Sequence, residues 1–281
     1  MSYIFDSQGN LLLSQGKTII QEITEEGYCV HYQSLYDNWT NKPSEAVADL
    51  QNTMVEDLID EGMQNRMDLL YITAQYSNDA SEACSNWINQ GTWDLKDVAA
   101  TDPSWNSLIG YFGNSGDDFL SCDDFNPSTD ASNYTKDSAT MGVWIYYDTD
   151  GGAPMGARGG GDYFRLYPKA GGDFNAVINS GSGFTGSNSD CEGLNIMTRR
   201  TAGEVEVYRN YTSLGTGDPS STAMPNAPLY FLACSINDNG SAYYSFGGAV
   251  SIAFVMDGVT DADVSTLTTI FKAYMDGIKA L

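Results

Sequence analysis

The pattern of apolar and polar positions is clearest in the C-terminal part of the chain. A short apolar run rich in strand formers, 229–235, precedes Asn239-Gly240, a dipeptide typical of tight hairpin turns. In the next run, 249–256, bulky and small side chains alternate. This alternation predicts a strand with its bulky face toward a core and its small residues where another layer comes close. The pattern therefore predicts strand, hairpin and strand in succession.

Two amphipathic helices are also predicted. Apolar residues recur at helical spacing from Val264 to Ile278, and Thr260 can cap that helix at its N-terminus. A second apolar stripe follows Ser44, a candidate N-cap, and the helix should end at Gly62. Its opposite face is acidic, which is typical of a solvated helix surface.

The remainder of the chain reads as short strands separated by turn residues. Runs rich in strand formers lie at 67–74, 141–147, 162–167, 175–178, 194–199 and 205–208, and a further short strand is predicted at 28–32. Many short strands with frequent turns indicate a sandwich or a barrel. Residues 1–42 are poor in core-forming periodicity and suit an arm that finds its partners on another subunit or another protein.

The charge balance narrows the function classes. The chain has 37 acidic and 13 basic residues, a net charge of −24, which argues against nucleic acid and anionic membrane surfaces as partners. Acidity that keeps the protein soluble is the simple explanation, and cation binding at acidic loops is the alternative. No apolar run approaches the roughly 20 residues that span a bilayer, so membrane insertion is not expected.

Cysteine usage and the N-terminus point to a reducing compartment. The five cysteines are an odd number without a C-x-x-C motif, which favours free thiols over disulfides or zinc. The first residues lack a basic segment followed by an apolar core, so no signal peptide is predicted.

One loop has the composition of a calcium site. Asp148-Thr-Asp150-Gly-Gly152 begins like a calcium loop, with alternating oxygen ligands and a glycine turn, but it lacks the later acidic ligand. A turn after the preceding strand is the simpler interpretation. A calcium site at Asp148 and Asp150, completed by a distant loop, stays open, and no other cofactor is predicted.

A second segment matches the sequence of a nucleotide-binding motif but not its structural context. Gly181-Ser-Gly-Phe-Thr-Gly186 reads G-x-G-x-x-G. That motif binds a dinucleotide only when it opens a helix, whose N-terminus holds the pyrophosphate. Residues 187–193 cannot form such a helix, so the segment is predicted to be a flexible hairpin loop.

Catalytic groups are sparse. Glu204 and Glu206 alternate on a candidate strand and so point to one face, but they lack the spacing and third acid of laminarinase-type hydrolases. A polar pair on an edge strand is favoured, and a glycoside hydrolase is the weaker alternative. His31 is the only histidine, which argues against a Ser-His-Asp triad and histidine metal sites. The protein is predicted not to be an enzyme.

Aromatic residues offer a different activity. Five tryptophans and several loop tyrosines could stack on sugar rings, although packing in the core and at strand edges is the favoured explanation for such residues. Trp93 and Trp105 are the candidate glycan-binding residues.

Several segments, in this order, resemble virion proteins of tailed bacteriophages. They are Ala83-Cys-Ser-Asn-Trp-Ile-Asn89, Thr92-Trp-Asp-Leu95, Phe125-Asn-Pro-Ser-Thr-Asp130 and Gly142-Val-Trp-Ile145, then 178–179, 194–199, 208–210 and 225–226. The ending, from Ile252 through the last helix, is similar to that of concanavalin A-like (LamG-like) jelly rolls in phage structural proteins. The resemblance covers residues 44–281, and its motifs are turn and strand signatures that transfer no catalytic residue.

The resemblance implies a mostly β protein, a two-sheet antiparallel jelly-roll sandwich with an N-terminal arm and helix and a C-terminal amphipathic helix. Residues 1–42 would be the arm that attaches to other virion proteins or forms oligomers, and 43–281 the helix and jelly-roll domain. The function implied is that of a virion structural protein, a head or tail fibre or a capsid decoration protein, assembled in the host bacterial cytoplasm. A homo-oligomer, a trimer by analogy with fibres, is expected. A carbohydrate-binding module that recognises a cell-surface glycan is the alternative.

Overall fold

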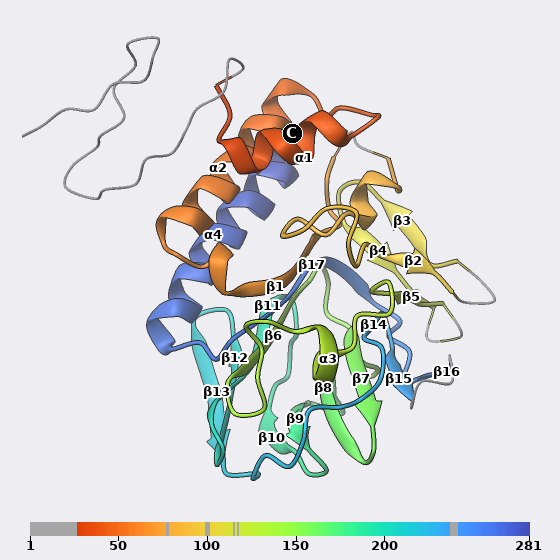
Figure 1. Ribbon diagram of the computed structural model, residues 1–281, viewed down its shortest axis with the longest axis vertical. Coiled ribbons are helices and arrows are strands. Elements are labelled where there is room, and N and C mark those ends of the chain that lie inside the picture. The colour runs from red at the N-terminus through yellow and green to blue at the C-terminus, as the bar shows by residue number, and fades with distance from the viewer. Residues whose placement is uncertain (1–26, 77–78, 99–101, 115, 117, 237–240) are drawn as a thin grey trace, which may run out of the picture.

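Two β-sheets pack face to face, and three helices cover the outer face of one of them (Figure 1). The computed structural model describes residues 27–281, apart from 77–78, 99–101, 115, 117 and 237–240. The arrangement confirms a mostly β jelly-roll sandwich with a C-terminal helix.

The eight-stranded sheet lies between the helices and the second sheet. Its order is β13 (Thr212–Gly217), β12 (Glu204–Arg209), β11 (Gly193–Thr201), β6 (Ala139–Ile145), β17 (Ala249–Met256), β4 (Gly110–Phe112) and β3 (Ser104–Asn106). The remaining strand, β1 (Met67–Ile72), pairs with β17. Every pairing is antiparallel.

The nine-stranded sheet forms the other layer. Its order is β10 (Phe184–Ser187), β9 (Asp173–Ser180), β8 (Asp162–Ala170), β7 (Met155–Gly159), β14 (Tyr230–Phe231), β5 (Leu120–Ser121) and β2 (Lys96–Asp97). A short hairpin of β15 (Cys234–Ile236) and β16 (Ser241–Tyr243) attaches to β7 through one parallel bridge, between Cys234 and Gly156.

The helices are α1 (Val30–Asn38), α2 (Glu45–Asp60), the short α3 (Pro127–Asp130) and α4 (Asp261–Ala280), with 3₁₀ turns at Gln64–Arg66 and Glu82–Cys84. The positions of α2 and α4 confirm the two predicted helices. Thr260 caps α4 as expected, since its hydroxyl accepts from the Asp263 amide and the Asp263 carboxylate accepts from the Thr260 amide. No helix in the described part of the chain is long and apolar enough to span a membrane.

The eight-stranded sheet is buried on both faces. On β17, Ala253 and Val255 face the second sheet, whereas Ile252, Phe254 and Met256 face the helices. Small side chains therefore line the core between the sheets on this strand, and the bulky ones fill the gap beneath the helices. Val250 joins the core between the sheets instead, because the pairing of β17 with β6 shifts register between Val250 and Ile252.

The Leu229 run does not pair with β17. It is broken by Leu232, whose φ of 66° interrupts the strand, so that β14 and β15 form in place of one strand. β15 pairs with β16, and β17 lies in the opposite sheet. A hairpin does follow the Leu229 run, as predicted, but it pairs β15 with the short β16, and β17 is not its partner. The turn dipeptide Asn239-Gly240 lies outside the described residues.

The start of the described chain is helical where a strand was predicted. Residues 28–32 lead into α1, whose buried side chains Tyr32 and Leu35, together with Trp39 just beyond it, follow helical spacing. They pack with α2 and α4 in one apolar cluster. Aromatic and β-branched residues at 28–32 favour a strand locally, and burial against α2 and α4 overrides that preference. The attachment role of residues 1–42 stays a prediction.

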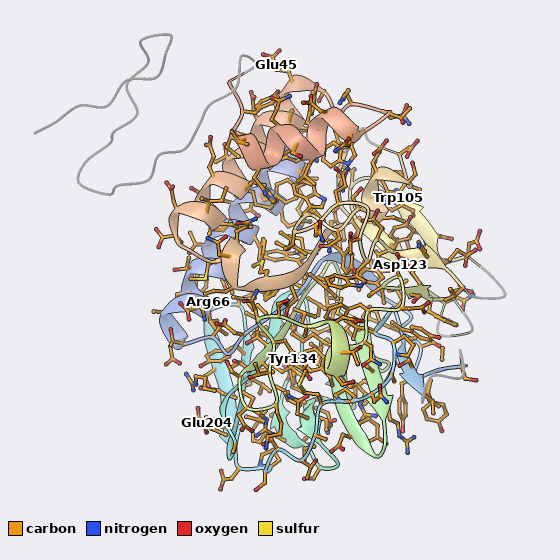
Figure 2. The ribbon with its side chains drawn as sticks, in the orientation of Figure 1. Glu45, Arg66, Trp105, Asp123, Tyr134 and Glu204 are labelled. Carbon is orange, nitrogen blue, oxygen red and sulfur yellow. The ribbon has the colours of Figure 1, made fainter. Side chains whose placement is uncertain are left out.

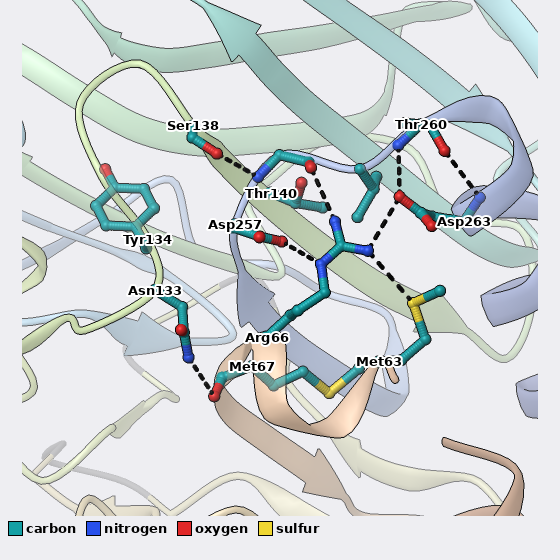
Figure 3. A network of polar contacts seen from close by, with 12 residues as sticks. Met63, Arg66, Met67, Asn133, Tyr134, Ser138, Thr140, Asp257, Thr260 and Asp263 are labelled. Atoms are coloured by element: carbon teal, nitrogen blue, oxygen red, sulfur yellow. Dashed lines mark hydrogen bonds and ion pairs between the residues drawn. The ribbon is translucent and has the colours of Figure 1, made fainter. Parts of the chain in front are cut away.

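A polar network joins the 3₁₀ turn that follows α2 to the start of α4 (Figure 3). Arg66 donates to Asp257 at 2.9 Å and to the Gly258 carbonyl at 3.0 Å, and its guanidinium lies 3.1 Å from the Asp263 carboxylate. Since Asp263 also caps α4, one arginine fixes the angle at which the last helix leaves β17.

All five cysteines are free thiols, as their odd number predicts, and four of them are buried. Burial raises the pKa of Cys122 and of Cys234 to about 12, so that both thiols stay protonated near neutral pH.

Candidate functional site

The acidic pair predicted to hold calcium is occupied by protein partners. Lys169 Nζ lies 2.5 Å from the Asp148 carboxylate, which also accepts from the Cys191 amide. The hydrogen bond from Lys169 lowers the pKa of Asp148. Asp150 accepts from the Gly171 amide at 2.8 Å. These contacts tie the loop after β6 to the end of β8, and among the described residues no three metal-ligating side chains cluster. Calcium binding here stays a prediction.

The two candidate glycan-binding tryptophans pack against the core between the sheets. The Trp93 ring meets Phe125 edge to face at a centroid distance of 5.0 Å. The Trp105 indole N–H donates to the Thr73 carbonyl at 2.9 Å. Both rings are only partly exposed, and their contacts are those of packed side chains. A sugar site at these residues stays a prediction.

The two glutamates point to one face of β12, as predicted, and share one arginine. Arg200 donates to Glu204 at 2.7 Å, pairs with Glu206 and lies 3.2 Å from Asp261. Strand β13 pairs with β12 and forms the edge of the sheet. The prediction that the two glutamates lie on an edge strand is therefore wrong. Figure 2 shows Glu204 far from Trp105, on the opposite side of the view. The arrangement links β11 and β12 to α4.

The lone histidine and the glycine-rich segment 181–186 both serve the fold. His31 Nε2 lies 2.7 Å from the Trp87 carbonyl, and the Gln64 amide lies beside the same ring. The glycine-rich segment 181–186 contains the turn between β9 and β10, which confirms the predicted hairpin.

The three long helices of the described chain, α1, α2 and α4, pack on the eight-stranded sheet and leave the outer face of the nine-stranded sheet uncovered (Figure 1). In Figure 1, α1, α2 and α4 lie in the upper and left part of the view, whereas β7, β15 and β16 lie at the lower right. On β8, Phe164 and Leu166 point into the core, so Tyr163, Arg165 and Tyr167 point outward. Side chains on the outer face of the nine-stranded sheet are therefore accessible to solvent.

Arginine and tyrosine side chains gather on that face. We call them the Arg–Tyr cluster, which consists of Arg158 on β7, Tyr163, Arg165 and Tyr167 on β8, Tyr243 on β16, and Tyr244. Gly156 makes room for it, because a Cβ there would meet Cys234 and Arg165 at 3.1–3.4 Å. Within the cluster, Tyr243 and Tyr244 are the exposed tyrosines, at 49% and 41%.

Arg165 lies at the centre of the cluster. Its guanidinium carbon is 4.5 Å from the ring centroids of Tyr163 and Tyr167 and 4.7 Å from that of Tyr244. Arg158 lies 4.9 Å from the Tyr163 ring, so two cations share one ring. Rings around a guanidinium hold its plane by cation–π attraction, each contact contributing about 0.5–1 kcal/mol at exposed sites. The arginine head is thus held in place.

Tyr244 adopts a strained backbone conformation. Its φ of 58° lies in the left-handed region, which is uncommon for a bulky residue. The Ala153 amide donates to the Tyr244 carbonyl at 2.7 Å, which fixes the backbone. The ring packs edge to face on Tyr167 at 5.4 Å and on Tyr243 at 4.2 Å. Strain of this kind persists where the surroundings enforce it, commonly at functional sites.

The polar atoms of the cluster have few protein partners. Neither Arg158 nor Arg165 has an ion pair within the described residues, although Arg66, Arg200 and Arg209 are each paired with a carboxylate. The buried Arg165 Nε and Tyr167 hydroxyl have no hydrogen-bond partner in the described part of the chain. Burial raises the pKa of Tyr167, and the charge of Arg165 opposes this shift.

Sequence reasoning missed this site, though part of its signal was present. Tyr163, Arg165 and Tyr167 occupy alternate positions of a predicted strand, so they share one face. Their partners come from Arg158 on the preceding strand and from 243–244, far along the chain. The bridge between β15 and β7 and the hydrogen bond from Ala153 to Tyr244 bring that last segment to the same face.

Solved structures of other proteins share the sandwich fold of this chain. No protein-family model and no curated protein matches this chain. A solved variant of a protein designated HCR/D is similar to it with a TM-score of 0.50 and 8% identity, over 73% of this chain and 52% of that one. The botulinum neurotoxin serotype G binding domain gives 0.48 and 9%, over 73% and 51%. The CBM40 of a Ruminococcus gnavus IT-sialidase, bound to α2,3-sialyllactose, gives 0.39 and 13%, over 48% and 84%. The first likeness shows a shared sandwich fold.

Proposed function

We propose that this protein is a non-enzymatic glycan-binding domain that holds its ligand on the Arg–Tyr cluster. The observation that carries the proposal is the cluster itself, with two half-exposed rings beside a guanidinium fixed in place. A sugar has C–H faces that pack on aromatic rings and hydroxyl groups that hydrogen-bond to polar side chains. Tyrosine offers both kinds of contact with few rotatable bonds, which keeps the entropy cost of binding low.

The proposal takes up the alternative that the sequence raises, carbohydrate recognition. A carbohydrate-binding module is among the proteins with a similar fold, and a ligand-bound example contains a sialylated lactose. The case for a sugar on this chain rests on the cluster and not on that likeness. Trp93 and Trp105 are the alternative location for a glycan site, and the experiment below distinguishes it from the Arg–Tyr cluster.

The first experiment is a glycan array followed by calorimetry with a glycan that binds. We expect the Tyr243→Ala/Tyr244→Ala double variant to bind about tenfold more weakly, because losing stacked rings costs on the order of 1.5 kcal/mol. Tyr211→Ala is the matched control, since Tyr211 is 53% exposed and lies between β12 and β13 on the other sheet. It should bind like the unmodified protein.

Binding of no glycan by the unmodified protein would contradict the proposal, and so would equal weakening by the two substitutions. The titrations are run with calcium and with a chelator. Loop 148–153 contacts Tyr244 through Ala153, so calcium bound at Asp148 and Asp150 would change the affinity.

A virion setting is the second part of the proposal, and it rests on the resemblance of residues 44–281 to phage structural proteins. Many copies on a particle would raise a weak single-site affinity by about 10²–10⁴-fold. Because α1 is packed into the helical layer, the deletion that tests attachment removes only residues 1–26. We expect it to leave folding intact and to abolish incorporation into particles. Normal incorporation would exclude attachment through these residues.

A further inference from the structure

We infer that the ligand of the Arg–Tyr cluster is an acidic glycan, one whose sugar carries a carboxylate, and that Arg158 and Arg165 receive that carboxylate. This inference rests on the proposed function and names its ligand class. It is carried by the charge of the cluster, the geometry of Arg165 and the rings beside it.

The cluster is cationic within a strongly acidic protein. The chain has 37 acidic residues against 13 basic ones, yet Arg158 and Arg165 have no carboxylate partner among the described residues. The buried Arg199 also lacks one, but its guanidinium donates to backbone carbonyls. Two guanidinium groups that share the Tyr163 ring repel each other, and an anion at the cluster relieves that repulsion.

The geometry of Arg165 suits a carboxylate. Three rings contact its guanidinium, which restricts its movement before a ligand arrives. A stacked guanidinium keeps its in-plane N–H donors, and these form the fork that binds both oxygens of a carboxylate. Arg165 Nε is buried and has no hydrogen-bond partner in the described structure, so no protein group competes for this donor.

The surroundings favour a sugar acid over a polyanion. The net charge of −24 repels nucleic acids and acidic protein surfaces, which present many charges over a wide area. A single carboxylate interacts mainly with the nearest charges, because the Debye length is about 8 Å at physiological salt. The half-exposed rings of Tyr243 and Tyr244 then provide apolar contact for the body of the sugar.

The test compares acidic and neutral sugars of the same core at about 0.15 M salt, where long-range repulsion is screened. The pairs are sialyllactose with lactose, and galacturonic-acid oligosaccharides with galactose oligosaccharides. We expect the unmodified protein to bind the acidic member of at least one pair at least tenfold more tightly. The Arg158→Gln/Arg165→Gln variant should lose that preference, and Arg165→Lys should retain part of it. Arg209→Gln, which removes an arginine already paired with Asp190, is the control and should keep the preference.

The outcomes separate the inference from the proposed function. Equal affinity for acidic and neutral sugars, both weakened by Tyr243→Ala/Tyr244→Ala, would overturn the acidic ligand and leave glycan binding standing. An acidic preference that survives Arg158→Gln/Arg165→Gln in a folded variant would also overturn the inference. Binding of no sugar at all would overturn both. Circular dichroism and thermal unfolding of each variant verify that the fold is retained.

Discussion

Replacing Asp68 by alanine is expected to lower the free energy of unfolding by about 3–5 kcal/mol, because three backbone N–H groups, that of the buried Tyr134 among them, lose their acceptor at once. Asp68 is buried, and its carboxylate accepts from the amides of Ser132 and Asn133 at 2.9 Å and of Tyr134 at 2.7 Å. Each unsatisfied donor costs about 1–3 kcal/mol, partly recovered if the loop opens to water.

The position of Asp68 explains why one side chain has this effect. The register of β1 against β17 shifts between Met67 and Leu69, and Asp68 lies at that irregularity. It thereby anchors the segment between α3 and β6 to the strand that follows α2. Urea denaturation measures the change, with Asp173→Ala as the control because Asp173 is exposed at the start of β9. A loss below about 1 kcal/mol for Asp68→Ala, similar to that expected for surface substitutions, would contradict this account.

Replacing Arg199 by methionine is expected to destabilise the protein by about 2–4 kcal/mol, because backbone carbonyls lose a buried donor while the volume of the side chain is largely kept. Arg199 is fully buried on β11. It donates to the carbonyls of Ile178 at 2.9 Å, Ala202 at 2.8 Å and Pro219 at 2.7 Å. The side chain thus joins the eight-stranded sheet to β9 of the other sheet.

The charge of Arg199 sets the size of this effect. Burial lowers the pKa of Arg199, so removing the charge recovers part of the cost of its desolvation. The carbonyls that remain unpaired account for the net loss. Arg209→Met is the control, because Arg209 lies at the surface with Asp190. A stable Arg199→Met variant with an unchanged urea midpoint would show that the carbonyls find other partners.

The elements that were predicted correctly are those specified by local signals. Thr260 and Asp263 form a capping box that can be read from adjacent residues, and the stripe from Val264 to Ile278 repeats at helical spacing. The α1 helix was missed because Val30 and Tyr32 favour strands locally and only their burial against other helices decides the outcome.

Strand partners and the site could not be predicted in the same way. Nothing near Ala249 indicates that β17 pairs with β1, β4 and β6 while β14 and β15 join the opposite sheet. Among the described residues, α1, α2 and α4 cover only one outer face of the sandwich (Figure 1), and this determines which alternating side chains reach solvent. The Arg–Tyr cluster depends on that choice and on contacts between Arg165 and Tyr244, which lie far apart in the sequence.

The most direct test of glycan binding on the Arg–Tyr cluster is an NMR titration of the isotope-labelled protein with a sugar that binds on the array. Backbone amide shifts should move along 156–158 and 163–167 and beside Tyr243 and Tyr244, the segments that carry the cluster. Shifts confined to the surroundings of Trp93 and Trp105, with the cluster unperturbed, would contradict the account.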